Sequence, residues 1–231
     1  MKSLARHLFL PLFFLAFSAT MAFAGWSGPK EIITGSWGSG AGQFGTRTEG
    51  GFSVVPSIEA VSTDQRVIIS DPVNRKHLVF NSKGERIEEA AWGETKGPSV
   101  SAIDPLYQRD RDAVTLHSLK VGSAAYRITI VFPEGNVDVD SDRDLRTATR
   151  DAVGFIYGIS AESVVRFDQS GKKTGSLSLP RAYEELVQVP GQRAPRGVYI
   201  EYGEPIIAPN GDVYLWQKSD AKYSVLKWTW Q

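Results

Sequence analysis

The sequence contains no cysteine, and its 231 residues include only three histidines and two methionines. Without cysteine the chain can form neither a disulfide nor a thiolate metal site. It also lacks a Gly-x-Ser-x-Gly nucleophile elbow, a His-Glu-x-x-His zinc motif and a Gly-Lys-Ser/Thr phosphate loop. Basic and acidic residues number 26 each, so no positive surplus indicates nucleic-acid binding. The sequence therefore contains no motif for thiol, zinc-protease or nucleotide-hydrolysing chemistry.

Residues 1–24 carry the three regions of a secretory signal peptide. Basic residues precede an apolar run from Leu8 to Phe17, and the small-x-small pattern Ala22-Phe23-Ala24 follows. The apolar run is shorter than the ~20 residues that a membrane span needs, and no charged stop-transfer segment follows it. We expect cleavage after Ala24 and a single mature domain, 25–231, that lies in the periplasm or outside the cell without membrane insertion.

From residue 25 onward, short runs rich in Val, Ile, Tyr and Phe end at Gly, Asn, Asp, Ser or Pro. This pattern is typical of short antiparallel strands. Only the segment 181–188 favours a helical turn. So many closely spaced strands predict an all-β fold, as a sandwich, a barrel or a propeller.

Internal repetition favours the propeller. Val79–Gly84 and Arg166–Gly171 are both strands that end in Phe and continue into a polar turn closed by Gly. They start 87 residues apart (166 − 79), which suits two blades of ~40 to 50 residues each.

Four units of up to four strands follow from this spacing: 57–92, 99–140, 146–179 and 205–230. The last unit lacks one strand, whereas an early strand, 31–37, has no unit of its own. We expect this early strand to complete the last unit, which would remove two open sheet edges. The prediction is a small β-propeller of four four-stranded blades, closed by the N-terminal strand, with room for an irregular fifth blade within 180–203.

The stretch 35–87 resembles the NHL-repeat family of β-propellers, in its exported bacterial form. The loop from Gly38 to Gly45 is similar to the family's inter-blade connection. The family's blade pattern is similar to Ile58–Val61, Val67–Asp71, Asn74, Lys76 and Leu78–Phe80. The later units match this pattern only in outline. The resemblance implies a ligand-binding face formed by loops. Some members of the family are enzymes.

Candidate ligand-face residues are Asp71, Asn74, Lys76 and Trp216. On a blade, Asp71 and Asn74 would lie in a loop at the face of the ring. Short carboxylate and amide side chains also bond nearby backbone amides, so the same pair is consistent with a purely structural turn. Trp216 belongs to an aromatic-rich C-terminal region that favours either a sugar-stacking platform or the core between blades.

Four carboxylates alternate along one segment: Asp138, Asp140, Asp142 and Asp144. In a strand they would share one face, and hard oxygen ligands suit calcium. The calcium-loop pattern fails, however, because Arg143 stands where Gly is needed and Thr149 where a carboxylate is needed. A solvated loop is the alternative. The remaining histidines, His77 and His117, fall in different units and do not predict a metal pair.

No catalytic motif emerges, and no cofactor is expected, with calcium as the one weak candidate. The leading hypothesis is a non-enzymatic binding or scaffolding module whose partner is a protein or carbohydrate on one propeller face. The alternative is a propeller hydrolase or lyase with a metal-assisted central site.

Overall fold

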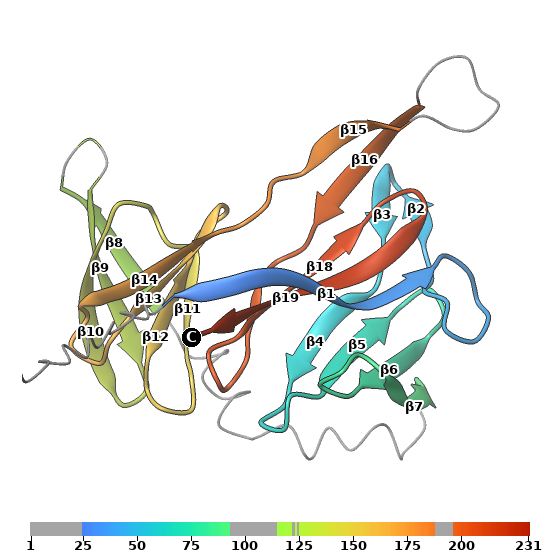
Figure 1. The fold of residues 1–231 in the computed structure, drawn as a ribbon. Helices are drawn as coiled ribbons and strands as arrows, with labels where there is room; N and C mark the ends of the chain where they lie inside the picture. Colours follow the sequence, from blue (N-terminus) through green and yellow to red (C-terminus); the bar gives the residue numbers. More distant parts are fainter. Residues whose placement is uncertain (1–24, 93–114, 122, 124, 188–195) are drawn as a thin grey trace, which may run out of the picture.

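A computed structural model describes residues 25–92, 115–121, 123, 125–187 and 196–231 (Figure 1). The predicted signal peptide and the predicted strand 99–104 lie outside these residues. Across the described part the chain is all-β, and it holds no helix long and apolar enough to cross a membrane. Four antiparallel sheets and one small hairpin make up the described part of the chain.

The sheets correspond to the four predicted units. Sheet one comprises β4 (Ser57–Val61), β5 (Val67–Asp71), β6 (Lys76–Phe80) and β7 (Arg86–Ala91). Sheet two comprises β8 (Thr115–Lys120), β9 (Tyr126–Phe132) and β10 (Gly135–Ser141). Sheet three comprises β11 (Thr147–Arg150), β12 (Ile156–Ile159), β13 (Ser163–Phe167) and β14 (Lys173–Ser178). Sheet four contains β17 (Ile206–Ile207), β18 (Val213–Lys218), β19 (Lys222–Trp230) and β1 (Trp26–Ser36), and two further strands, β15 (Tyr183–Val187) and β16 (Arg196–Tyr202), extend it beyond β18.

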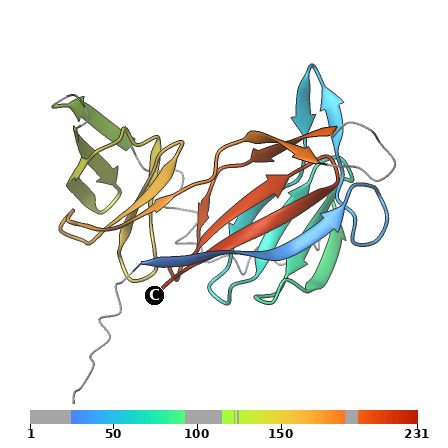
Figure 2. The ribbon, with the colours of Figure 1, turned by 45° about the horizontal axis from the view of Figure 1, so that its top comes forward.

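The predicted pairing of the N-terminal strand with the last strand is confirmed. β1 runs antiparallel to β19, from Trp26 opposite Trp230 to Ser36 opposite Lys222. The strand begins earlier than the predicted residue 31. Because β1 occupies the outer position of sheet four, the first and last parts of the described chain share one sheet (Figure 2).

The turn between the first two strands has the same construction in three sheets. In sheets one, three and four it spans Ser62–Arg66, Asp151–Phe155 and Ala208–Asp212, and each copy is closed by the same pair of backbone hydrogen bonds. The fourth residue of each turn has a positive φ, which is +63° at Gln65, +93° at Gly154 and +84° at Gly211. The repeat is therefore real at the level of backbone geometry, although the side chains differ.

The two turns that revealed the repeat in sequence are also equivalent in space. Gly84 and Gly171 both have positive φ, at +83° and +84°. A Cβ on Gly84 would lie 1.7 Å from the carbonyl oxygen of Ile32 in β1, and one on Gly171 would lie 2.1 Å from that of Asp138 in β10. Each turn thus rests on the outer strand of the neighbouring sheet, and only glycine permits this close approach.

Three apolar clusters join the sheets in the spatial order one, four, three, two. The first lies between sheets one and four, the second between four and three, and the third between three and two. Within the described residues no cluster joins sheet one to sheet two; the outer face of sheet one has a small cluster of its own, Ala60, Ile68 and Val79. The observed arrangement is an open row of four sheets (Figure 1).

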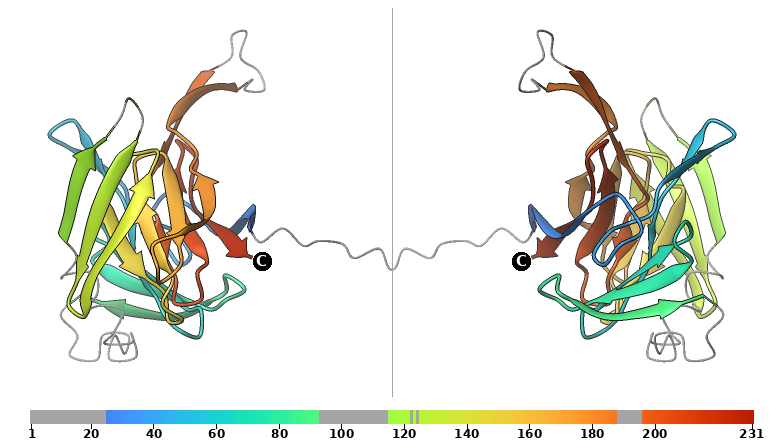
Figure 3. Two further views of the ribbon diagram at one scale, coloured as in Figure 1. Left: turned by 90° about the vertical axis from the view of Figure 1, so that its left-hand side faces the viewer. Right: turned by 90° about the vertical axis from the view of Figure 1, so that its right-hand side faces the viewer.

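Two segments differ from the prediction. The helical turn expected at 181–188 is wrong, because β15 (Tyr183–Val187) is a strand that pairs with β16 (Arg196–Tyr202). Cross-strand pairing here overrides the helical propensity of its Glu and Leu residues. This hairpin joins β18 at its base and projects from the body, so its described part extends sheet four instead of forming a fifth blade (Figure 3). A short hairpin of β2 (Arg47–Glu49) and β3 (Phe52–Val54) was not predicted.

Candidate functional site

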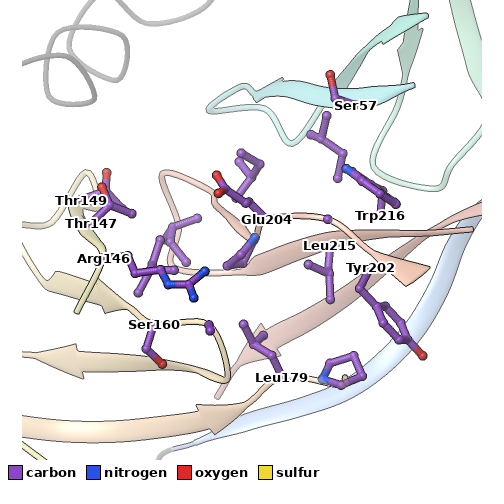
Figure 4. Close-up of a pocket in the computed structure, with 18 of the residues that line it drawn as sticks. Ser57, Arg146, Thr147, Thr149, Ser160, Leu179, Tyr202, Glu204, Leu215 and Trp216 are labelled. Atoms are coloured by element: carbon purple, nitrogen blue, oxygen red, sulfur yellow. The ribbon is translucent and has the colours of Figure 1, made fainter. Parts of the chain in front are cut away.

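A cavity of about 590 Å³ lies where the first strands of sheets one, three and four converge. Among the described strands, β4 and β11 each pair with a neighbour on one side only, and β17 pairs with β18. The remaining lining comes from the end of β12 and the turn after it, the segment that follows β14, the base of the hairpin arm and the middle of β18. The cavity therefore lies between the first strands of three of the four sheets (Figure 4).

The floor of the cavity is apolar and rigid. Its lining includes Leu179, Leu215, Ile206 and Ile207, all of them buried. These residues also belong to the clusters that hold the sheets together. A ligand on this floor would contact side chains that are already ordered, so little entropy would be lost on binding.

Two side chains of opposite charge line the cavity, Arg146 and Glu204 (Figure 4). Both residues are exposed. Within the described residues neither makes an ion pair or a side-chain hydrogen bond, either with the other or with a third group. This distinguishes them from the charged residues around them, since Arg143 pairs with Glu162 at 2.9 Å and Lys218 pairs with Glu201 at 2.7 Å.

The backbone holds Arg146 at the start of sheet three. The amide of Arg146 donates to the carbonyl of Ile159 at 2.7 Å. The preceding residue, Leu145, is buried and packs over Gly158, where a Cβ would lie 2.3 Å from its Cδ1. With one neighbour anchored in the core, the Arg146 guanidinium extends into the cavity (Figure 4).

Glu204 is held in a similar way at the start of sheet four. The amide of Gly203 donates to the carbonyl of Trp216 at 3.1 Å, and Pro205 restricts the backbone on the other side. Trp216 itself is wedged in place, because a Cβ on Gly203 would lie 2.0 Å from its indole nitrogen and its ring stacks on Tyr223. The indole ring forms part of the cavity wall away from Arg146 (Figure 4).

Asp71 and Asn74 lie outside the cavity and hold a loop. The buried Asp71 carboxylate accepts hydrogen bonds from the backbone amides of Gly45 and Asn74, at 2.9 and 3.0 Å. The Asn74 side chain donates to Asp71 and to the carbonyl of Gly38, both at 2.9 Å. The pair thus ties the Gly38–Gly45 loop to sheet one, in agreement with the structural alternative. The third candidate, Lys76, is also buried, with its Nζ 3.4 Å from Glu89.

The four aspartates lie on and beyond β10, and they do not line the cavity. Asp138 accepts from Thr129 at 2.6 Å, Asp140 pairs with Arg127 at 3.2 Å, and Asp142 lies 3.8 Å from Lys173. Among the described residues no three carboxylate, histidine or cysteine side chains are grouped as metal ligands would be. Asp138, Asp140, Asp142 and Asp144 therefore lie away from the cavity, on and beyond the outer strand of sheet two.

The aromatic region is mainly core. Tyr223 and Trp228 are buried within the clusters of sheet four. Trp26 contacts Trp230 edge to face, with the ring centroids 4.6 Å apart. Of the aromatic residues in this C-terminal region, only Trp216 and Tyr202 line the cavity. His77 lies 3.2 Å from Glu59 on sheet one, while His117 is exposed on β8 in sheet two.

Sequence reasoning missed Arg146 and Glu204. Neither belongs to a motif. A positional signal does exist, because Arg146 directly precedes β11 and Glu204 lies two residues before β17. These are the starts of the first strands of two predicted units, and residues of the first strands of sheets one, three and four line the cavity.

No family model matches the chain, and no curated protein matches it. Among solved structures, the crystal structure of BBS1N in complex with ARL6DN, soaked with lead, is 12% identical. The match covers 76% of this chain and 68% of that one, with a TM-score of 0.19. So low a score carries no argument about fold or function.

Proposed function

We propose that the protein is an exported, propeller-like binding module that holds a small ligand in the cavity between sheets one, three and four. The observation that carries the proposal is a pair of charges, Arg146 and Glu204, which have no side-chain partner among the described residues and lie above a buried apolar floor. A cavity of about 590 Å³ falls in the range that suits a small-molecule ligand. Apolar walls with a few charged groups are typical of such sites.

The propeller part of the proposal rests on the repeated turns and on the pairing of β1 with β19. In a ring of four such sheets, the outer face of sheet one would meet sheet two, and its small cluster of Ala60, Ile68 and Val79 would become part of that contact. Export rests on the leader pattern in residues 1–24.

A binding role is favoured over hydrolysis because of the groups that line the cavity. One guanidinium, one carboxylate and several hydroxyl groups do not form a nucleophile with an adjacent base, and no histidine is among the described lining residues. The aspartates that motivate a metal-assisted hydrolase or lyase lie on the outer strand of sheet two.

A pair of alanine variants tests the proposal. Ala161 is exposed at the rim of the cavity, in the turn between β12 and β13. Ala221 is exposed in the corresponding turn between β18 and β19 and does not line the cavity. Ala161→Phe would obstruct the cavity, whereas Ala221→Phe adds the same ring elsewhere.

The measurement is the melting temperature with and without a small-molecule extract of the envelope and medium of the producing cells. A bound ligand raises the melting temperature of the folded protein. We expect a rise for the parent protein and for Ala221→Phe, and a smaller rise or none for Ala161→Phe. An equal rise in all three proteins, or no rise in the parent, would overturn the proposal.

A further inference from the structure

The polar side chains of the cavity indicate the chemical class of its ligand, and this step rests on the proposed function. Beside Arg146 and Glu204, the cavity is lined by three side-chain hydroxyl groups that make no hydrogen bond within the described residues, those of Ser57, Thr147 and Thr149. One cation, one carboxylate and three hydroxyl groups are therefore available to a ligand. A ligand with several hydroxyl groups and a single charge would use most of them.

Hydrogen-bond donors gather at the sheet-three end of the cavity. Arg146 directly precedes β11, and Thr147 and Thr149 alternate with Ala148 along this strand, so the two threonines share a face. Figure 4 shows both threonines on the same side of the cavity as the Arg146 side chain. A guanidinium donates two parallel hydrogen bonds to a carboxylate, and nearby hydroxyl groups add further donors. This end of the cavity therefore favours an anionic group of the ligand.

Glu204 can be satisfied without a cation. An ionised carboxylate accepts at both of its oxygens, so two neighbouring hydroxyl groups of a ligand can donate one hydrogen bond to each. A free amino acid would also satisfy Arg146 and Glu204 through its two charges, but it has few further polar groups for the hydroxyl groups of the lining. A cavity of about 590 Å³ also suits a ligand larger than a free amino acid. A polyhydroxylated anion matches the lining better.

The aromatic wall provides a surface for a sugar ring. In the view of Figure 4, Glu204 lies between Arg146 and the indole ring of Trp216. The indole ring is held in place before any ligand arrives, because it is wedged against Gly203 and stacks on Tyr223. The face of an aromatic ring carries partial negative charge, which attracts the C–H groups on one side of a sugar ring. A second sugar ring therefore finds an apolar contact at the end of the cavity away from Arg146.

We infer that the cavity binds an acidic disaccharide, with a uronic-acid carboxylate on Arg146, ring hydroxyl groups on Glu204 and a neutral sugar ring against Trp216. The carboxylate and the guanidinium form charge-assisted, bidentate hydrogen bonds, and the hydroxyl groups of Thr147 and Thr149 donate beside them. The carboxylates of ligand and protein stay apart, because the anionic group of the disaccharide lies at the Arg146 end of the site.

The test uses pairs of disaccharides that differ in one group. In the acidic member, glucuronic, galacturonic or mannuronic acid is linked to glucose; in the neutral member, a hydroxymethyl group replaces the carboxylate. Calorimetric titration of the purified protein measures the affinity for both members of each pair. We expect at least one acidic disaccharide to bind about tenfold or more tightly than its neutral counterpart, because hydrogen bonds between charged partners are stronger than those to neutral groups.

Variants of the lining assign each part of the disaccharide to its contact. Arg146→Gln should bind the acidic and neutral members equally. Glu204→Gln should weaken binding of the neutral member and retain the preference for the acidic one, and Trp216→Leu should weaken both by the same factor. Arg127→Gln and Glu49→Gln remove exposed charges that do not line the cavity, and both should match the parent. Circular dichroism checks that each variant is folded.

Three results would overturn the inference: no binding of any acidic disaccharide, equal affinity of the parent for acidic and neutral members, or an unchanged preference in Arg146→Gln. If no disaccharide binds while a mixture of free amino acids raises the melting temperature of the parent, the ligand is zwitterionic and the sugar inference is wrong. If the disaccharides fail while the extract still stabilises the parent and Ala221→Phe but not Ala161→Phe, the sugar inference falls and the binding module stands. If the extract also has no effect, both proposals fall together.

Discussion

The guanidinium of Arg166 lies 4.1 Å from the ring centroid of Trp230, and on its other side it lies 3.3 Å from that of Phe155. Arg166 belongs to β13 in sheet three, whereas Trp230 ends β19 in sheet four. The cation is buried, and its Nε donates to the hydroxyl of Tyr157 at 3.1 Å. The contact between these two sheets therefore includes a cation between two aromatic rings as well as apolar packing.

Arg166→Leu should destabilise the protein by about 2 to 4 kcal/mol. The substitution removes two desolvated cation–π contacts and leaves the Tyr157 hydroxyl without its donor. The midpoint of urea unfolding measures the loss. Arg127→Leu, at an exposed ion pair in sheet two, should change stability by less than about 0.5 kcal/mol. Equal midpoints for the two variants would show that the cation contributes nothing to the joint between the sheets.

Removing the hydroxyl of the buried Tyr157 should destabilise the fold, whereas removing that of the buried Tyr223 should not. Tyr157 donates to Asp151 at 2.8 Å and accepts from Arg166, so Tyr157→Phe should cost about 1 to 3 kcal/mol. The hydroxyl of Tyr223 is buried with no hydrogen-bond partner among the described residues, so Tyr223→Phe should be neutral or stabilising. Thermal and urea unfolding of both variants provide the comparison. A large loss in Tyr223→Phe would reveal a hydrogen bond to a group outside the described chain.

Alkaline pH should destabilise the fold through its buried tyrosines. Burial raises the pKa of Tyr157, Tyr214 and Tyr223 above the ordinary value of 10, and for Tyr157 the hydrogen bond to Asp151 raises it further. The unfolded chain releases these protons near pH 10 while the folded chain retains them, so their contribution is complete below pH 10 and is lost as the pH rises above it. Melting temperatures between pH 8 and 12 should show this fall.

The variant Tyr223→Phe provides the control for the pH series. It should reduce the fall in the free energy of unfolding at alkaline pH by up to about 1.4 kcal/mol per pH unit. The reason is that the folded and unfolded states then differ by one bound proton fewer. Identical slopes for parent and Tyr223→Phe would mean that this tyrosine already ionises in the folded protein.

Gly84→Ala and Gly51→Ala form a matched pair. Their φ angles are nearly the same, at +83° and +85°, so both substitutions incur about 1 to 2 kcal/mol of backbone strain. At Gly51 a Cβ would meet nothing within 4 Å, whereas at Gly84 it would lie 1.7 Å from the Ile32 carbonyl. Gly84→Ala should therefore cost clearly more, about 3 kcal/mol or above, as the turn is forced off β1. A difference of less than about 0.5 kcal/mol in urea unfolding would contradict this contact.

Much of the fold could be predicted from the sequence because it depends on local signals. The glycine-closed turns at 81–85 and 168–172 identified the repeat, and the spare strand near the N-terminus identified the partner of β19. The first strand of the arm, β15, was missed because its Glu-rich sequence has helical propensity, and only its pairing with β16 makes it extended. Side chains of the arm such as Leu186 and Tyr199 remain exposed, so no alternation of buried apolar and exposed polar residues indicated β15 in the sequence.

The cavity could not be predicted in the same way. Arg146 and Glu204 are 58 residues apart (204 − 146), and nothing local brings them together. The sequence drew attention instead to Asp71 and Asn74, whose side chains prove to be engaged with backbone amides, and to aspartates whose partners are cross-strand residues. Short polar side chains are as useful for holding loops as for holding ligands, and sequence alone does not separate the two uses.

The pairing of β1 with β19 also bears on the order in which the molecule folds. Residues that touch across this pair are far apart along the chain, as for Ser27 and Gln231, which are 204 positions apart. Joining such distant segments has a large loop-closure cost, and contacts of this kind slow folding. Sheets one and three consist of strands that follow one another directly, so they can assemble as soon as their own residues are present. We expect sheet four to be the last to form, and the cavity, whose wall it provides, to be absent from every earlier folding intermediate.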